Sequence, residues 1–405
     1  MQTSLNSEVL NRVQYLTGNA EEVARIPETP ALIPFSSVII DFLNDVSKCL
    51  MKNPDAKYFS DVVTFGFWIR KASIGKLKER FEPQDGNLHL GKGVAFHIAP
   101  SNVPVNFAYS LVSGLLCGNA NIVRVPSKDF PQVNLIVDAI NDSLERHKNM
   151  RPYIFLVRYD RDKEINDLFS FFADVRIVWG GDNTIAELRK SPLPPRSSEI
   201  TFADRYSIAV IDSDAYLEMK EKKQVAQDFY NDTFFSDQNA CTSPRIVIWT
   251  GNRIEEAKDV FWDEEHKLVE AKYQFQPIQG VNKLTSSYLV SVAIPGCRIE
   301  PHDDNLIVRV KVPSISDTLM DYKDNSGFFF EYDCKDLMEL KNLCNNKRCQ
   351  TLSFLGDPKA FMPLVESGIK GIDRIVPIGK TMDFDLIWDG LNLYYSLTRN
   401  IGVKL

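Results

Sequence analysis

Residues 94–104 read Val-Ala-Phe-His-Ile-Ala-Pro-Ser-Asn-Val-Pro, and this stretch decides the fold of the chain. Its apolar half, residues 94–98, predicts a buried strand, and its two prolines fix a turn. Residues 105–116 continue as an apolar helix that stops at Gly118, and residues 121–125 read as a second buried strand. A strand, a helix and a second strand in this order predict a right-handed βαβ unit with a parallel sheet.

The same alternation continues toward the C-terminus. We expect helices over 131–147 and 163–172 and strands over 153–157 and 175–179. A second alternating block follows the Pro192–Pro195 break, with strands expected at 207–211, 245–249, 306–312 and 351–354. Before the first block, residues 37–50 and 61–79 have apolar residues at helical spacing.

These patterns predict an α/β protein with two Rossmann-type parallel-sheet domains. The first domain is expected over residues 1–206 and the second over 207–376, followed by a C-terminal arm over 377–405. Residues 382–403 are rich in aromatic and apolar residues. They fit an arm that crosses between domains or makes an oligomer contact, and they fit a last strand and helix of the same sheet equally well.

Composition excludes several classes of protein. The net charge is -7 and no long basic run appears, which argues against a nucleic-acid binder. No apolar stretch approaches the roughly 18 residues of a membrane span, and the first residues do not resemble a signal peptide. Seven cysteines without a CxxC pair indicate a reducing compartment, so we expect a cytoplasmic protein. The five histidines have no metal-ligand spacing, so we expect no metal site.

One cysteine stands apart from the other six. Cys241 lies in the stretch Asp-Gln-Asn-Ala-Cys-Thr-Ser-Pro-Arg, residues 237–245, just before a predicted buried strand. Most cysteines beside a strand are small buried hydrophobes. Here the neighbours are small and polar, and a reactive thiolate needs such surroundings. Cys241 is therefore our candidate nucleophile.

The remaining candidate residues lie where predicted strands of the first block end. In parallel sheets ligands bind at the carboxyl ends of strands. The residues are Pro100, Ser101 and Asn102, then Arg124, Ser127 and Lys128, then Gly180 and Gly181. An Asn in a turn is most often a local backbone partner, a charged loop is most often solvated, and Gly-Gly can be a simple turn. In the functional interpretation, Asn102 donates to an oxyanion, the basic residues attract phosphate and ribose oxygens, and the glycines let backbone approach a cofactor.

Together and in this order, the motifs resemble the aldehyde dehydrogenase superfamily, and more closely its LuxC-type acyl-CoA reductases. The resemblance covers roughly residues 90 to 400. Its motifs are HIAPSNVP at 97–104, GNANIVR at 118–124, WGG at 179–181, QNACTSP at 238–244, QTL at 350–352 and GIDRIVPIG at 371–379.

The resemblance implies an aldehyde dehydrogenase-like fold, with a dinucleotide-binding domain, a catalytic domain and the active site between them. It makes Cys241 the nucleophile, and Asn102 with the backbone N–H of Cys241 the oxyanion hole. Arg124 matches a cofactor-contacting lysine of the superfamily, and Ser127 falls where members that prefer NAD often have a ribose-binding glutamate. Since that carboxylate is absent and Lys128 stands beside the position, NADPH is the expected cofactor. Pro100, Ser101, Gly180 and Gly181 complete the expected cofactor site.

The chain departs from the superfamily at two glutamates. Phe202 falls at or next to the position of the general base of hydrolytic aldehyde dehydrogenases, although Glu199 is three residues away. The second glutamate, which contacts the cofactor, has no match that can be placed. Without a base to activate water, an acyl-enzyme should not be hydrolysed efficiently, which suits a reductase.

The expected activity is therefore NADPH-dependent reduction of a fatty acyl-CoA or acyl thioester to the aldehyde. Two alternatives stay open: an NADP-dependent aldehyde dehydrogenase that acts oxidatively, and a non-redox module that carries an acyl group on Cys241. A catalytically dead scaffold is disfavoured because the nucleophile and the oxyanion donor are both present. From the resemblance we also expect a homo-oligomer and an acyl-protein synthetase as partner.

Overall fold

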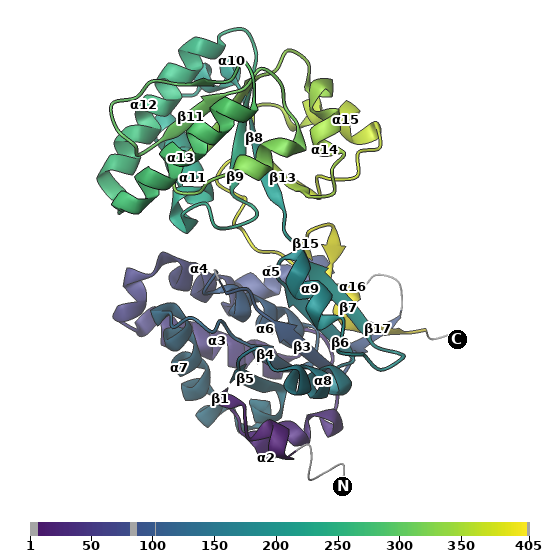
Figure 1. Ribbon diagram of the computed structural model, residues 1–405. Helices are drawn as coiled ribbons and strands as arrows, with labels where there is room; N and C mark the ends of the chain where they lie inside the picture. Colours follow the sequence, from purple (N-terminus) through teal and green to yellow (C-terminus); the bar gives the residue numbers. More distant parts are fainter. Residues whose placement is uncertain (1–6, 82–86, 102, 403–405) are drawn as a thin grey trace. The chain divides into compact units, whose positions relative to one another are not determined.

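The computed structural model describes residues 7–81, 87–101 and 103–402, and it contains two compact units. Unit 1 comprises residues up to Ala203 together with the segment from Leu391, and unit 2 comprises Asp204–Gly390. Each unit is an α/β body built on one main sheet (Figure 1). The fold class expected from the sequence is confirmed.

The main sheet of unit 1 has the strand order β1-β5-β4-β3-β6-β7. All its pairs are parallel except the edge pair β1–β5. The bounds are β1 Gln14–Thr17, β3 Val94–Ile98, β4 Ala120–Arg124, β5 Ile154–Arg158, β6 Val175–Trp179 and β7 Ser198–Phe202. From β3 the chain runs outward through β4 and β5, then returns to add β6 and β7 on the other side of β3. The order therefore reverses next to β3, which makes this the switch point of the sheet.

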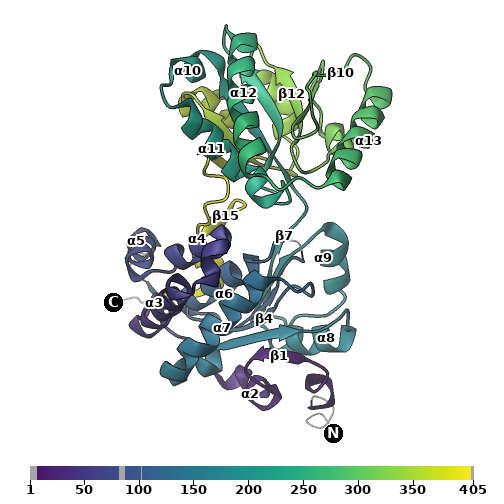
Figure 2. The same cartoon turned by 90° about the vertical axis from the view of Figure 1, so that its left-hand side faces the viewer.

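Helices cover both faces of this sheet, which is why β3 and β6 are buried over their whole length (Figure 2). Those that connect the strands are α6 Asn106–Leu116, α7 Pro131–Arg146, α8 Lys163–Phe172 and α9 Asp182–Leu188. Those that precede the sheet are α2 Ala20–Ala24, α3 Ser37–Lys52, α4 Ser60–Trp68 and α5 Lys71–Phe81.

The sequence predicted one helix over 61–79, and the structure has two. Helix α4 ends at Trp68 because Arg70 Nε and Ser73 Oγ both donate to the carbonyl of Phe67, which would otherwise continue the helical ladder. The backbone N–H of Lys71 then donates to Asn44 Oδ1 of α3 and starts α5.

The main sheet of unit 2 has the order β10-β11-β12-β9-β8-β13-β14, and only the pair β10–β11 is antiparallel. Its two faces bury separate apolar clusters. Ile208 and Ile246 belong to one cluster, whereas Ala209 and Val247 belong to the other. The bounds are β8 Tyr206–Asp212, β9 Pro244–Thr250, β10 Arg298–Ile299, β11 Val308–Lys311, β12 Phe328–Asp333, β13 Cys349–Leu355 and β14 Arg374–Pro377.

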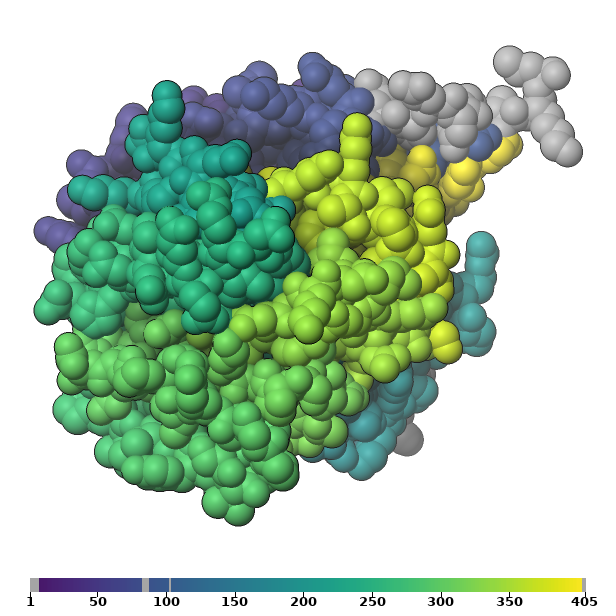
Figure 3. Space-filling view, turned by 90° about the horizontal axis from the view of Figure 1, so that it is seen from above, coloured from purple at the N-terminus to yellow at the C-terminus, as the bar shows by residue number. Residues whose placement is uncertain are grey.

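The helices of unit 2 lie on both faces of this sheet, and Figure 3 shows the surface of the unit seen from above. Their bounds are α10 Ser213–Glu218, α11 Lys222–Asp232, α12 Ile254–Lys272, α13 Pro277–Ala293, α14 Lys341–Cys344 and α15 Met362–Glu366. Strands β7, β12 and β14 and helix α13 lie outside the elements that the sequence pattern predicts.

The C-terminal segment leaves unit 2 at Gly390 and continues in unit 1. Residues 378–390, which we had placed in the arm, lie in unit 2, where Asp232 accepts from the backbone N–H groups of Gly379 and Thr381. In unit 1, α16 Leu393–Leu397 leads to β17 Thr398–Ile401, which pairs antiparallel with β2 Leu88–Gly91. The last strand thus joins a separate two-stranded sheet and neither main sheet, so the alternative of a final strand of the same sheet is wrong.

Candidate active site

The loops that carry the predicted cofactor residues lie at one edge of the unit 1 sheet. Strands β4, β3 and β6 are neighbours, and Ile98 at the end of β3 is in register with Arg124 of β4 and Val178 of β6. The half-buried Pro100 and exposed Ser101 follow β3, the exposed Ser127 and Lys128 follow β4, and Gly180 and Gly181 follow β6. All seven predicted positions thus meet at the carboxyl edge, beside the switch point. Asn102, the predicted oxyanion donor, lies outside the described residues.

Arg124 is held at this edge by its own sheet. Its Nε and Nη2 donate to the carbonyl of Tyr159, at 3.3 and 3.1 Å, and its guanidinium lies 4.7 Å from the centre of the Tyr159 ring. The ring and the carbonyl fix the plane of the guanidinium and leave Nη1 outside these bonds. Lys128 differs, because its side chain is exposed and its ammonium group lies 5.0 Å from the centre of the Phe130 ring.

The backbone does not require glycine at position 181. Gly181 caps α9 with an ordinary φ of -64°, and a Cβ built there would meet no atom within 4 Å. At Gly180 the nearest contact of such a Cβ would be the Thr184 methyl carbon, at 3.2 Å. The backbone is therefore open to close approach of a ligand at Gly181, whereas the Thr184 side chain already lies close at Gly180.

Phe202, which the resemblance places at or next to the position of the general base in hydrolytic aldehyde dehydrogenases, ends β7 beside the end of β6. It is buried and stacks on Trp179, with ring centres 3.7 Å apart and planes 17° from parallel. Glu199 is three residues earlier on the same strand, so the two side chains leave opposite faces. The Glu199 carboxylate also pairs with Arg176, at 2.5 Å, and with Arg189, at 2.8 Å. These ion pairs hold Glu199 on a different face of the sheet from Phe202.

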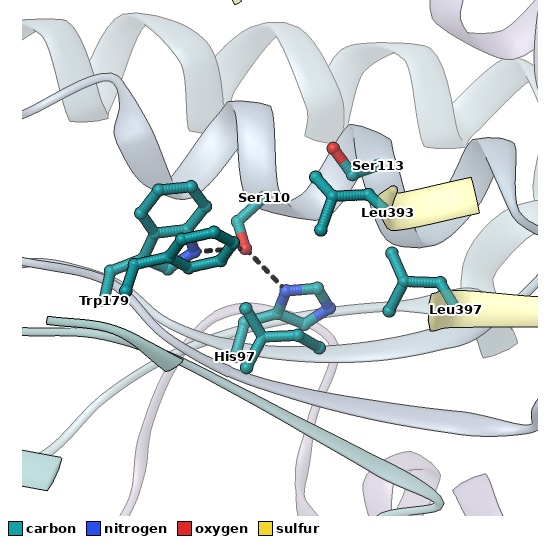
Figure 4. Close-up of a pocket in the computed structure, with 8 residues that line it drawn as sticks. His97, Ser110, Ser113, Trp179, Leu393 and Leu397 are labelled. Atoms are coloured by element: carbon teal, nitrogen blue, oxygen red, sulfur yellow. Dashed lines mark hydrogen bonds between the residues drawn. The ribbon is translucent and has the colours of Figure 1, made fainter. Parts of the chain in front are cut away.

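A buried histidine connects these strands below the carboxyl edge, in a small pocket of unit 1 (Figure 4). Trp179 Nε1 donates to Ser110 Oγ at 3.0 Å, and Ser110 Oγ lies 2.7 Å from His97 Nδ1. On the other side of the ring, His97 Nε2 lies 3.0 Å from Asn121 Oδ1. The rest of the pocket lining is mostly apolar: Ser113, Ile177, Phe202, Leu393 and Leu397.

The protons in this network can be placed. The amide of Asn121 donates to the carbonyls of Asn119 and Tyr153, so its Oδ1 must accept from His97 Nε2. His97 Nδ1 then accepts from the Ser110 hydroxyl, which itself accepts from Trp179. Burial lowers the pKa of His97 to about 4, so the ring is neutral at physiological pH. His97 therefore ties β3 to β4 and α6 as a neutral spacer, a role that the sequence motif did not reveal.

In unit 2, Cys241 lies at the amino edge of the sheet, on the loop that leads into β9. Asp237 and Gln238 in this loop adopt left-handed backbone angles, with φ of 53° and 51°. The buried amide of Gln238 donates to the carbonyls of Pro244 and Phe328 and accepts from the N–H groups of Gly327 and Phe328. All four bonds of this amide are thus made, and they offset the cost of the unusual backbone.

Arg245 adds a second clamp on the same loop. Its buried guanidinium donates to the carbonyls of Gln238 and Asp324 and to Asn325 Oδ1. Asn325 Nδ2 in turn donates to Asn239 Oδ1 at 2.8 Å. Gln238 and Asn239, which we had considered as polar neighbours of the thiol, therefore fix the loop that presents it. Cys241 itself is only half-buried.

The electrostatics around Cys241 favour the thiol over the thiolate in unit 2. Burial raises its pKa to about 12 and the carboxylate of Asp389 adds to the rise, while Arg205 and the backbone N–H of Cys241 oppose it. Asp389 accepts a hydrogen bond from Gln350, and burial raises the pKa of Asp389 to about 7. Arg205 pairs with Asp373. Desolvation and Asp389 outweigh the single cation, so the polar sequence neighbours of Cys241 do not lower the pKa of this thiol.

The described part of the chain contains no group of three His, Cys, Asp or Glu side chains placed to hold a metal ion. None of its helices combines the length and the apolar character that crossing a bilayer requires.

A protein-family model described as acyl-CoA reductase (LuxC) matches residues 76–268, which include the carboxyl edge of unit 1 and the Cys241 loop. The matched segment is just under half of the chain, and it is similar to the LuxC-type acyl-CoA reductases. Curated relatives of this chain are named long-chain acyl-protein thioester reductases. The one from Aliivibrio fischeri is 24% identical over 294 residues, which cover 71% of this chain and 58% of the relative. The one from Photobacterium phosphoreum is 26% identical over 323 residues, which cover 77% of this chain and 63% of the relative. The chain thus spans less than two thirds of the length of these relatives.

Solved structures similar to this chain include aldehyde dehydrogenases. Methylmalonate-semialdehyde dehydrogenase from Oceanimonas doudoroffii has a TM-score of 0.66 at 12% identity, covering 98% of this chain and 89% of that one. Glyceraldehyde-3-phosphate dehydrogenase from Methanocaldococcus jannaschii, complexed with NADP, has a TM-score of 0.64 at 10% identity, covering 98% and 93%. At these identities the likeness establishes the aldehyde dehydrogenase-like fold.

Proposed function

We propose that this chain reduces an acyl thioester, either a fatty acyl-CoA or an acyl group carried on a protein, to the aldehyde through an acyl-cysteine on Cys241. The observation that carries the proposal is the Cys241 loop. Buried hydrogen bonds of Gln238 and Arg245 fix this loop, and Cys241 on the loop is half-buried. The names of the curated relatives, long-chain acyl-protein thioester reductases, support the same class of substrate.

The carboxyl edge of unit 1 fits a nicotinamide dinucleotide, and NADPH is the form we propose. Arg124 and Lys128 supply positive charge for phosphate oxygens, and Ser127 leaves the neighbouring position without a carboxylate. Gly181 leaves open space at a helix start, and Gly180, Pro100 and Ser101 complete the edge. When bound, NADPH supplies the hydride that reduces the acyl group.

The chain's own residues handle the acyl group. The sulfur of Cys241 attacks the thioester carbonyl, a new C–S bond forms, and the substrate's thiolate leaves with the electron pair of the old one. The backbone N–H of Cys241 and, in our proposal, the amide of Asn102 stabilise the oxyanion. After reduction the C–S bond to Cys241 breaks, which releases the aldehyde and restores the thiolate.

The acyl-cysteine must survive until it is reduced. Phe202 places a buried ring where hydrolytic relatives have a base, and Glu199 is held by Arg176 and Arg189 on the opposite face. Water activation at that position is therefore disfavoured, which supports reduction over the oxidative alternative. An acyl-protein synthetase partner, a homo-oligomeric state and a cytoplasmic location also belong to this proposal.

The test is turnover of long-chain acyl-CoA. With NADPH, the wild type should oxidise the cofactor and release one aldehyde for each NADPH consumed. Cys241→Ala should lower kcat at least a thousandfold, because the covalent step is lost. The matched control is Cys297→Ala, another half-buried cysteine of unit 2, which should keep the wild-type rate. Aldehyde formation by Cys241→Ala at the wild-type rate would contradict the proposal.

A further inference from the structure

Asp389 lies one residue before the end of unit 2, and its backbone conformation is unusual. Its φ of 50° is left-handed, a region that residues other than glycine adopt uncommonly. The residue is also buried, with 5% of its surface exposed. Strained backbone angles persist only where the surrounding structure fixes them, and they are concentrated at functional sites. The contacts that fix Asp389 therefore indicate what this carboxylate does.

The side chain that holds Asp389 is Gln350 on β13. Gln350 is fully buried, and its Nε2 donates to Asp389 Oδ1. Its Oε1 makes no hydrogen bond with any other described residue. An amide in this place can donate to a carboxylate and, when turned over, accept from a carboxylic acid. Gln350 can therefore bind Asp389 in both of its protonation states.

The pairing of β13 with β8 brings this bonded pair to the Cys241 loop. Cys349 of β13 pairs with Tyr206 of β8, so Gln350, the next residue of β13, lies beside Ser207, with a bulge at this point of the register. The hydroxyl of Ser207 donates to the carbonyl of Cys241 at 2.8 Å. Gln350 and the Cys241 backbone are thus attached to the same corner of the unit 2 sheet.

The segment that carries the aspartate also contacts the Cys241 loop directly. Thr242 Oγ1 donates to Met382 Sδ at 3.2 Å. Arg374 donates to three backbone carbonyls of residues 380–383, and its guanidinium lies 4.3 Å from the centre of the Trp388 ring. These contacts fix the segment on both sides of the loop contact, up to the residue before the aspartate.

A proton donor and a proton acceptor meet in this corner. After burial, Asp389 contributes most to the raised pKa of Cys241, and burial raises the pKa of Asp389 itself to about 7. Four other ionisable groups act on the two side chains: Arg205, Arg374, Asp204 and Asp373. Above pH 7 a carboxylate therefore faces a protonated thiol. No hydrogen bond within the described residues joins them, and a proton crosses such a gap through one water molecule or when bound substrate draws the groups together.

We propose that Asp389, held by Gln350, accepts the proton of the Cys241 thiol and then gives it to the departing thiol of the substrate. The carboxylate takes the S–H proton as the sulfur forms its bond to the thioester carbonyl. When the bond to the leaving sulfur breaks, that sulfur keeps the electron pair and takes the proton from the carboxylic acid. Asp389 is then a carboxylate again. This inference rests on the proposed function, because it concerns acyl transfer to Cys241.

Two reactions of the same sulfur test this proton transfer in Asp389→Asn, which keeps the shape of the side chain. Acyl transfer from palmitoyl-CoA to Cys241, followed at pH 8.5 without reduced cofactor by quenched-flow mass spectrometry, should slow at least about a hundredfold. Alkylation by iodoacetamide should not slow, because loss of the charge lowers the pKa of the thiol and iodide leaves without a proton. Damage to packing would slow both reactions, and repulsion by Asp389 alone would make both faster in the variant.

Asp383→Asn, which changes an exposed acid of the same segment, is the matched control and should equal the wild type in both reactions. Gln350→Met removes the amide that holds Asp389 and should slow acyl transfer in the same selective way; it provides the same comparison if Asp389→Asn does not fold. Acyl transfer to folded Asp389→Asn at the wild-type rate or faster, or an equal loss in both reactions, would overturn the inference and leave the proposed function intact. A wild type that is never acylated at Cys241 would overturn both.

Discussion

At the scale of single residues, the fold raises the pKa of Cys241, which the polar residues beside it in the sequence did not indicate. Burial and Asp389 both raise its pKa, and Arg205 is the cation that opposes them. A thiol in this state is protonated at neutral pH, and the thiolate is the nucleophile. The rate of acyl transfer to Cys241 should therefore rise with pH until another step limits turnover.

Asp389→Asn should lower the pKa of Cys241, because it removes the nearby negative charge and keeps an acceptor for Gln350. Asp389 is ionised above a pH of about 7, so the effect should appear above that pH. We expect about threefold to tenfold faster alkylation of Cys241 by iodoacetamide at pH 8.5. Asp383→Asn, an exposed acid of the same segment, is the control and should match the wild type. If the pH dependence of Cys241 alkylation in Asp389→Asn equals that of the wild type, or shifts to higher pH, then Asp389 does not raise the pKa of Cys241.

Lys128 is the residue on which cofactor choice should depend. Its exposed ammonium group can reach a 2'-phosphate, whereas NADH lacks that group. Lys128→Ala should raise the KM for NADPH about tenfold, which is a loss of about 1.4 kcal/mol, and leave the KM for NADH unchanged. Lys148→Ala, another exposed lysine of unit 1, serves as control. Equal changes in the KM for NADPH and the KM for NADH, or a wild type that prefers NADH, would show that Lys128 does not bind the 2'-phosphate.

At the scale of elements, the strands and helices around residues 94–125 were predictable because proline and glycine mark their ends. The positions of the side chains that fix the site were not. Gln238 is bonded to Phe328, which lies on a strand 90 residues later in the chain. The face that Glu199 takes follows from the register of β7 beside β6. Such contacts depend on strand pairing between distant segments, which local periodicity does not encode.

The link between β3, β4 and α6 predicts a pH-dependent stability for unit 1. The pKa of His97 is about 4 in the folded chain and near 6.5 when unfolded, so the folded state disfavours the protonated ring. The stabilisation is complete above about pH 6.5 and is lost as the pH falls toward 4, by about 3 kcal/mol.

Urea unfolding at pH 7 and pH 4 should reveal this loss. His97→Gln removes the titration but keeps a donor for Asn121, so its deficit in unfolding free energy relative to wild type should shrink at pH 4. His266→Gln, a half-exposed histidine of unit 2, is the control and should keep the same difference at both pH values. A deficit for His97→Gln that is constant or grows on acidification would contradict a neutral buried His97.

At the scale of the whole molecule, the candidate functional residues lie at the carboxyl edge of one main sheet and at the amino edge of the other. Unit 1 gathers its candidate cofactor residues at the carboxyl edge, as the sequence predicted from strand ends. Unit 2 presents Cys241 at the amino edge, where the rule for ligand sites in parallel sheets gives no guidance.

The most direct measurement is the mass of the protein after incubation with palmitoyl-CoA and no reduced cofactor, followed by peptide mapping. The account predicts that one acyl group is added, that it maps to the peptide containing Cys241, and that it disappears with release of aldehyde when NADPH is supplied. Acylation on another residue, or an acyl group at Cys241 that NADPH does not discharge as aldehyde, would contradict it.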